Sequence, residues 1–301
     1  MAGSGWRRRV QRVRVSPSFK STASEAGFFA AYDAVLGLWP VPFEPVEVPS
    51  AYGTTHIQAC GPVDGPPLVL LHAGGATSTV WFNNVGDLSR THRVYAVDQI
   101  GDAGRSVHDG HPIRGVKDFM AWLDGLFDSL GLHGAALGGH SYGAWLALNY
   151  ALHAPQQISK LVLLDPTGCF AGMKMSYRLH ALPLFARPSA ARMRDFLTWE
   201  SGGAPLDATW LHLAALTGGE VRGSKLILPR RPQAGRLRAC MVSTLQVLAE
   251  KSKSLDIDRA AANAQQLMPH VVNTVLPGAT HHTIPTVNAA QLNREILHFL
   301  A

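Results

Sequence analysis

The chain has 301 residues, of which 47% are hydrophobic and 16% charged, a composition that predicts a globular protein with a large buried core. No apolar run reaches the roughly 18 residues that a membrane-spanning helix needs, and the N-terminus lacks the apolar stretch of a signal peptide. We therefore expect a cytoplasmic protein with no membrane partner. The three cysteines, Cys60, Cys169 and Cys240, have no metal-ligand spacing, which argues against a disulfide framework and against a zinc site.

The positive charge of the chain is concentrated at its N-terminus. The net charge is +6, and residues 1–20 carry six Lys and Arg side chains but no Asp or Glu. Such a segment can contact nucleic acid, but here no aromatic residues are interleaved with the cations and no nucleic-acid-binding fold follows. We expect residues 1–20 to form a basic, flexible N-terminal arm and expect no nucleic-acid partner.

Apolar runs alternate with amphipathic stretches along most of the chain. The runs are short, rich in β-formers and bounded by turn residues, as in the buried strands of a parallel sheet. The stretches between them have helical spacing, so the order predicts an α/β fold with helices on both faces of a mostly parallel sheet. The predicted strands are 67–75, 93–101, 134–141, 160–168, 244–252 and 273–282, and the predicted helices are 116–130, 142–154, 258–268 and 286–300.

One segment, residues 168–238, interrupts this alternation. It is helical in pattern, rich in Met, Trp and Pro, and contains no convincing strand. We therefore predict a helical cap inserted into a core made of residues 21–167 and 239–301. Its large apolar side chains could line an acyl pocket, but we expect most to pack the cap onto the sheet and assign none to binding: Met173, Met175, Phe185, Met193, Phe196, Trp199 and Trp210.

A serine flanked by glycines follows the predicted strand 134–141. Residues 139–143 read Gly-His-Ser-Tyr-Gly, a G-x-S-x-G pattern that is weak evidence by itself. Its position between a strand and a helix is the context in which small neighbours let a strained serine project above the sheet edge. A serine hydroxyl is a poor nucleophile unless a histidine base and an orienting carboxylate assist it. Ser141 is therefore the candidate nucleophile.

Four motifs occur in a family-like order and spacing: "LLHAGG" from residue 70, "VDQIGDAGRS" from 97, "GGHSYG" from 138 and "LPGATHH" from 276. Over about residues 45–301 the chain resembles the α/β-hydrolase family, and within it the bacterial carboxylesterase-type serine hydrolases. The resemblance implies an α/β-hydrolase fold with a helical cap, a Ser-Asp-His triad on strand ends and an oxyanion hole. We expect neither a cofactor nor a metal.

The resemblance places the base after the last strand. The family's G-x-G-H pattern falls on residues 278–281, which makes His281 the expected base and leaves its neighbour His282 as the second candidate. His140, beside the nucleophile, is expected to pack or hydrogen-bond locally.

The acid is the position at which this chain departs from the family. Many relatives end the penultimate strand with an Asp that serves as the triad acid, but Ser252 occupies that position here, and a serine cannot stabilise an imidazolium as a carboxylate does. Some members carry an acid four residues later, so we expect Asp256 to be the acid. Asp165, at the end of the preceding strand, is the second candidate, followed by Glu250 and Asp258.

An oxyanion hole requires two preorganised N–H groups. The backbone amides of Tyr142, next to the nucleophile, and Gly74, in the first glycine turn, are the candidates. These residues predict hydrolysis of a small carboxylic ester, lactone or thioester through an acyl-enzyme. Another triad reaction, such as carbon–carbon bond hydrolysis, cyclisation or acyl transfer, stays open, as does a non-catalytic ligand-binding protein. The motifs leave the acyl chain length and the oligomeric state open.

Overall fold

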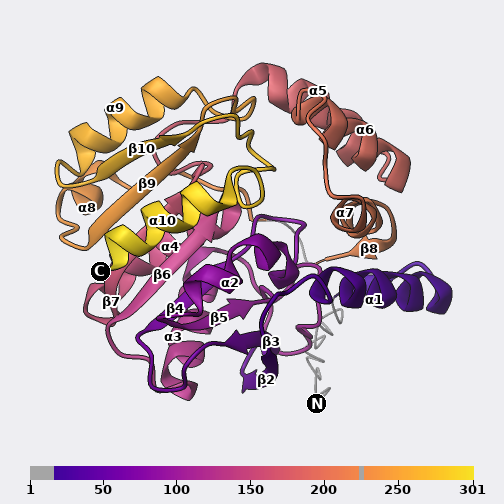
Figure 1. Cartoon of the computed structure of the whole chain (residues 1–301), viewed down its shortest axis with the longest axis horizontal. Helices are drawn as coiled ribbons and strands as arrows, with labels where there is room; N and C mark the ends of the chain where they lie inside the picture. Colours follow the sequence, from indigo (N-terminus) through magenta and orange to yellow (C-terminus); the bar gives the residue numbers. More distant parts are fainter. Residues whose placement is uncertain (1–16, 224–226) are drawn as a thin grey trace, which may run out of the picture.

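A twisted eight-stranded sheet forms the centre of the molecule (Figure 1). The computed structural model describes residues 17–223 and 227–301, and within these ranges the strand order is β10-β9-β7-β6-β4-β5-β3-β2. β3 runs antiparallel to both its neighbours, while the other strands share one direction. The strands are β2 (Phe43–Ser50), β3 (Gly53–Cys60), β4 (Pro67–Leu71), β5 (Arg93–Val97), β6 (Ala135–His140), β7 (Ile158–Leu164), β9 (Ser243–Ala249) and β10 (Val272–Leu276).

Helices cover both faces of this sheet and bury two separate apolar layers. Side chains alternate along each strand, so Val69 and Leu71 of β4 belong to one layer and Leu68 and Leu70 to the other. The helices that pack on the first layer are α3 (Val116–Ser129), α4 (Tyr142–His153), α8 (Ala234–Arg238) and α9 (Ile257–Leu267), and those on the second are α2 (Val85–Leu88) and α10 (Ala289–Leu300), together with the 3-10 helix η1 (Ser78–Asn83). A second 3-10 helix, η2 (Pro155–Gln157), leads into β7.

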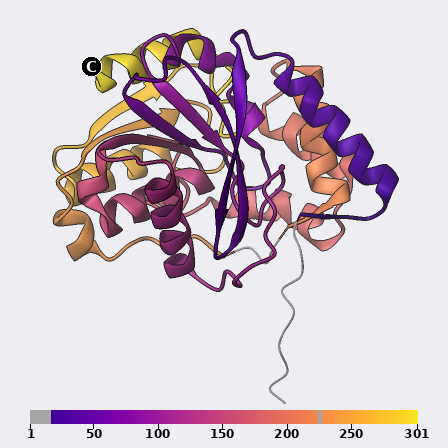
Figure 2. The same ribbon diagram turned by 90° about the horizontal axis from the view of Figure 1, so that it is seen from below.

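Three further helices leave the core after β7 and stand beside the sheet edge (Figure 1). They are α5 (Met175–Ala186), α6 (Ala190–Glu200) and α7 (Ala208–Glu220). The N-terminal helix α1 (Thr22–Leu36) packs along α7, as the view from below also shows (Figure 2). The short strand β1 (Ser18–Phe19) pairs antiparallel with β8 (Val221–Arg222), which follows α7. The N-terminal part of the described chain is therefore joined to the cap.

The structure confirms the predicted α/β architecture and all six predicted strands, which end earlier than expected because the turn residues after them belong to loops. Other elements differ from expectation. The hairpin β2–β3 and helix α1 were not predicted. Proline within a run argues against a strand, but β2 accommodates Pro45 and Pro49 because it lies at the sheet edge, where proline is tolerated. The segment 168–238 contains a strand, β8, and its last helix α8 packs on the core through Leu237.

The expected N-terminal arm also has a different boundary. Residues 1–16 lie outside the described residues, but Ser18 and Phe19 form β1, and the ring of Phe19 contacts the rings of Phe28 and Phe29 on α1. Lys20 forms an ion pair with Glu220 at the end of α7. Residues 17–20 are therefore packed against α1 and the cap. Burial of the apolar ring of Phe19 stabilises this packing.

Candidate active site

The turn between β6 and α4 holds Ser141 in a strained conformation. Its φ of 54° and ψ of −107° lie outside the regions that residues with a Cβ prefer, which is typical of a nucleophile raised above a sheet edge. Two glycines permit the turn. A Cβ on Gly139 would lie 2.4 Å from the carbonyl carbon of Gly143, and one on Gly143 would lie 2.3 Å from the oxygen of Leu71. The motif therefore packs α4 directly onto the end of β4.

His281 follows β10 and reaches the serine across the sheet edge. Its Nε2 lies 2.9 Å from Oγ of Ser141, and the residue is only 2% exposed. Oγ1 of Thr167 also lies 3.2 Å from Oγ of Ser141. The expectation that His281, rather than His282, approaches the nucleophile agrees with this geometry.

Asp165, directly after β7, occupies the other side of the imidazole. Its Oδ2 lies 2.5 Å from Nδ1 of His281, and its side chain is fully buried. Because a carboxylate only accepts hydrogen bonds, Nδ1 carries the proton and Nε2 is free to accept from the Ser141 hydroxyl. Ser252 Oγ donates to the same Oδ2 at 2.7 Å, and the N–H of Ala249 donates to Oδ1 at 3.1 Å. Three donors thus fix the carboxylate.

The expected contact of Asp256 with the base is wrong. Asp256 is exposed and is the N-cap of α9, where its Oδ1 accepts a hydrogen bond from the N–H of Arg259 at 3.0 Å. Its carboxylate is therefore satisfied locally. Glu250 likewise has a partner elsewhere, the N–H of Gly278, and the first turn of α9 holds Asp258 away from the imidazole. Asp165 is the carboxylate that lies against His281.

The two expected oxyanion donors lie side by side. A Cβ on Gly74 would be 3.4 Å from Cβ of Tyr142, and Tyr142 is the first residue of α4, where backbone N–H groups lack partners within the helix. The neighbouring N–H of Gly75 instead donates to Oδ2 of Asp102 at 2.9 Å. The amide of Gly75 is therefore occupied, while Gly74 lies beside the N-terminus of α4, as the expectation for an oxyanion donor requires.

Two further histidines flank His281 in neutral form. Burial, followed by the charge of His281, lowers the pKa of His140 well below its usual value and that of His282 to about 3. Nε2 of His140 donates to the backbone oxygen of His281 at 2.7 Å, which confirms a local hydrogen-bonding role. Oη of Tyr177, on α5, lies 2.8 Å from Nε2 of His282. Both rings therefore stay uncharged near neutral pH.

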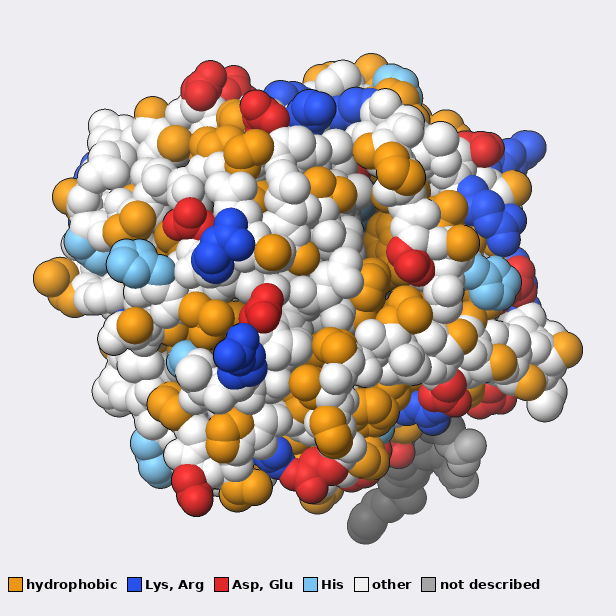
Figure 3. Space-filling model, viewed as in Figure 1, with side chains coloured by type: hydrophobic (Ala, Val, Ile, Leu, Met, Phe, Trp, Pro, Cys, Tyr) orange, Lys and Arg blue, Asp and Glu red, His pale blue; other side chains and the backbone are white. Residues whose placement is uncertain are grey.

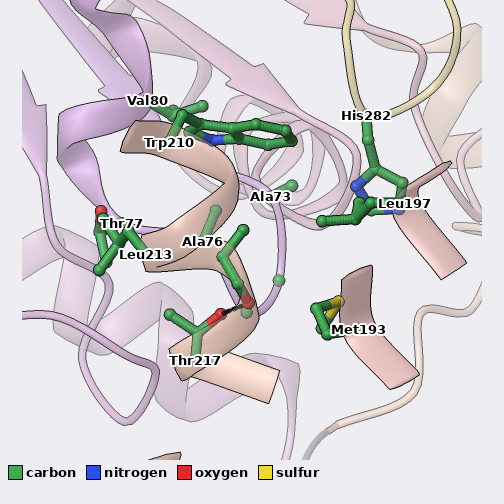
Figure 4. A pocket seen from close by; sticks show the side chains of 13 residues that line it. Ala73, Ala76, Thr77, Val80, Met193, Leu197, Trp210, Leu213, Thr217 and His282 are labelled. Carbon is green, nitrogen blue, oxygen red and sulfur yellow. Dashed lines mark hydrogen bonds between the residues drawn. The ribbon is translucent and has the colours of Figure 1, made fainter. Parts of the chain in front are cut away.

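An apolar pocket opens between the cap and the loop that follows β4. Figure 4 shows side chains of α6 and α7 facing this loop, with His282 at one side. Hydrophobic side chains also gather along the furrow between the core and the cap in the space-filling view (Figure 3). Of the large cap residues considered from the sequence, Met193 and Trp210 line the pocket, whereas Met175 is exposed. The lining residues include Ala73, Gly74, Thr77, Val80, Met193, Leu197, Trp210, Leu213, Thr217 and His282.

Sequence reasoning missed the polar residues that the fold adds to this site. Thr167 lies in the loop after β7, Tyr177 on α5 and Glu200 on α6, and the residues around them form no motif that we identified. Across residues 17–223 and 227–301, no cluster of His, Cys, Asp or Glu has the arrangement of a metal site. In the same ranges no helix is both long and apolar enough to cross a bilayer.

Comparison with known sequences links the chain to hydrolases. A family model described as "Alpha/beta hydrolase family" matches residues 68–295. The chain is 28% identical over 295 residues to carboxylesterase YbfK of Bacillus subtilis (strain 168), an alignment that covers 96% of this chain and 98% of the relative. It is 32% identical over 142 residues, 44% of this chain and 49% of the relative, to a 2-hydroxy-6-oxo-6-phenylhexa-2,4-dienoate hydrolase of Comamonas testosteroni.

Solved structures give the same result over nearly the whole chain. The crystal structure of carboxylesterase CesB (YbfK) from Bacillus subtilis has a TM-score of 0.86 and 28% identity, covering 93% of this chain and 99% of that chain. The naproxen esterase (carboxylesterase NP) from the same organism also has a TM-score of 0.86, at 27% identity, covering 94% of this chain and 100% of that chain. At this coverage the similarity extends into the cap, because the core alone is shorter than the aligned length.

Proposed function

Because the chain belongs to the alpha/beta hydrolase family and is an ester hydrolase of its carboxylesterase type, we propose that Ser141, His281 and Asp165 are its catalytic triad and act through an acyl-enzyme intermediate. The observation that carries this proposal is the continuous hydrogen-bond chain from Oγ of Ser141 through His281 to Oδ2 of Asp165. All three residues are buried at the carboxyl edge of the sheet, so water competes little for these bonds.

The chemistry follows from the tautomer of His281. Oγ of Ser141 attacks the ester carbonyl carbon while Nε2 takes the hydroxyl proton, and the buried carboxylate of Asp165 stabilises the imidazolium that forms. We propose that the amides of Gly74 and Tyr142 bind the negative charge on the carbonyl oxygen, and the close approach of these two residues supports this assignment. The imidazolium then returns its proton to the departing alkoxide, which leaves as an alcohol. Water then attacks the acyl carbon while Nε2 of His281 takes its proton, the bond to Oγ breaks, and the imidazolium returns the proton to Oγ as the acid leaves.

The pocket beside the oxyanion loop supports an ester with an apolar acyl group. It is bounded by the loop of Gly74 on one side and by Met193, Leu197 and Trp210 on the other. An apolar group in this space is removed from water, which contributes roughly 25 cal/mol for each Å² buried. We therefore propose a small-molecule ester whose acyl portion is hydrophobic.

Replacement of the nucleophile tests this function. Ser141→Ala should abolish turnover of a short p-nitrophenyl ester, since loss of a triad serine costs on the order of a million-fold in another serine hydrolase. A fluorophosphonate probe should label the wild-type protein and not the variant. Ser243→Ala is the matched control, because Ser243 is exposed and begins β9, at the opposite edge of the sheet.

Two outcomes would contradict the proposal. Labelling of a wild-type protein that turns over no ester would favour another triad reaction, such as carbon–carbon bond hydrolysis. Failure of the wild-type protein to react with the probe at all would favour a non-catalytic ligand-binding role.

A further inference from the structure

Glu200, on the cap helix α6, has a buried carboxylate that contacts the loop of His281. It is the last residue of α6, and none of its surface is exposed. A buried charge is costly unless donors or cations compensate it. Among the described residues no cationic side chain forms an ion pair with Glu200. Its negative charge must therefore be satisfied by hydrogen bonds alone.

All of these hydrogen bonds come from the loop that carries the base. Oε1 accepts from the backbone N–H of His281 at 2.9 Å, and Oε2 accepts from Oγ1 of Thr280 at 2.7 Å and from the N–H of His282 at 3.2 Å. Three consecutive residues are thus bound by one side chain from an element 80 residues earlier in the sequence. Hydrogen bonds to a charged acceptor are shorter and stronger than neutral ones.

The peptide groups on both sides of His281 are fixed. While Glu200 binds its N–H, the neutral ring of His140 donates to its carbonyl oxygen at 2.7 Å. The imidazole itself lies between Asp165 and Ser141. The backbone of the base is therefore clamped between the cap and the nucleophile turn, independently of the contacts of its ring.

We infer that Glu200 is a positioning residue, which holds the backbone of His281 from the cap so that Nε2 stays in line with Ser141. This inference rests on the proposed function of His281 as the base. A displacement of about 1 Å at a catalytic group can cost on the order of 100-fold in rate. Met193 and Leu197, on the same helix, line the pocket, so α6 connects the place of the acyl group to the place of the base.

Glu200→Gln is the most specific test because it keeps the shape of the side chain but replaces one of its two acceptor oxygens with a donor. Each oxygen of Glu200 accepts from a backbone N–H, Oε1 from that of His281 and Oε2 from that of His282. In glutamine one of these atoms becomes an NH₂ group, so either orientation of the amide places a donor against a donor. Asp195→Asn is the matched control, since Asp195 is an exposed carboxylate on the same helix.

Glu200→Gln should lower kcat for a p-nitrophenyl ester by about 10-fold to 100-fold with little change in KM. The acid limb of the pH–kcat profile should also move to lower pH, because a negative charge near the imidazolium is lost. The other groups that face His281 are unchanged in the variant: Asp165, His140, His282 and Tyr177. Asp195→Asn should match the wild-type protein in both measurements.

Thr280→Val provides a second variant that keeps the carboxylate. It removes the shortest hydrogen bond of Glu200 while the two backbone donors remain, so kcat should fall by a few-fold, less than in Glu200→Gln. Wild-type kcat and an unmoved pH profile in both variants, even with a lower melting temperature, would overturn the inference and leave Glu200 a purely structural residue. An inactive, unlabelled wild-type protein would instead defeat the proposed function, and the inference with it.

Discussion

The loops that follow β7 and β9 lie side by side at the carboxyl edge of the sheet, yet only the first brings a carboxylate to the base. The β7 loop places Asp165 against His281, whereas the β9 loop has Ser252 at the position where the family resemblance led us to look for the acid. Ser252 donates to Asp165 at 2.7 Å. The comparison shows that two adjacent parallel strands can together provide one oriented carboxylate, because their carboxyl ends lie next to each other. One loop supplies the charge and the other supplies a donor that holds it.

The largest effect should come from the β7 loop. We expect Asp165→Asn to lower kcat by about four orders of magnitude, because an amide no longer selects the tautomer of His281 or stabilises its imidazolium. Steady-state turnover of a p-nitrophenyl ester measures this loss. Asp256→Asn is the control and should retain wild-type turnover, since that residue caps α9. A larger loss in Asp256→Asn than in Asp165→Asn would reverse the assignment of the acid.

A smaller effect should come from the β9 loop. Ser252→Ala removes one of the three donors to Asp165 but leaves the N–H of Ala249 and the contact with His281. A hydrogen bond to a charged group contributes about 1.5–3 kcal/mol, and each 1.4 kcal/mol corresponds to about tenfold in rate. We expect kcat to fall about tenfold. Ser254→Ala is the control, because Oγ of Ser254 is buried in the same loop without a hydrogen-bond partner among the described residues. Equal turnover in the two variants would show that the β9 loop contributes nothing to the acid.

The smallest effect should come from the N-cap of α9 and should change stability but not turnover. Asp256→Ala should lower the free energy of unfolding by about 1 kcal/mol through loss of the N-cap of α9, which corresponds to a melting temperature roughly 2–4 °C lower in a domain of this size. Thermal unfolding and ester turnover are measured on the same sample, and turnover should not change. Asp258→Ala, which removes a carboxylate from the same helical turn, should change the melting temperature less. A loss of turnover in Asp256→Ala would reopen its role in the site.

The same two loops show how far sequence reasoning reached. Ser141 was predicted from its strand-to-helix turn, and His281 from the family resemblance, which aligns a post-strand motif with Gly-Ala-Thr-His at residues 278–281. The acid could not be placed in this way. Asp165 and Asp256 each follow a strand in the sequence, and only the pairing of β7 with β9 and the capping of α9 distinguish them. The strand pairing is a tertiary fact, whereas the cap is a local signal, an Asp that accepts from the N–H three residues later, which the sequence reading overlooked.

Glu200 was missed for a related reason, because its partners lie 80 residues or more away along the chain. A signal was nevertheless present. Glu200 lies four residues after Phe196 and three after Leu197, both buried, and this spacing places the carboxylate on the apolar face of α6. A charged residue on the buried face of a helix indicates a partner across the interface.

The strained turn at Ser141 also sets a limit on how stable this protein can become. A residue with a Cβ held at φ 54° costs on the order of 1–3 kcal/mol, and glycine adopts such conformations without that strain. Ser141→Ala and Ser141→Gly both lack the hydroxyl, so the difference between their melting temperatures reports the strain, less the greater backbone entropy of glycine. If the glycine variant also melts higher than the wild-type protein, selection for heat resistance alone would favour loss of Ser141, and only selection for turnover would retain it.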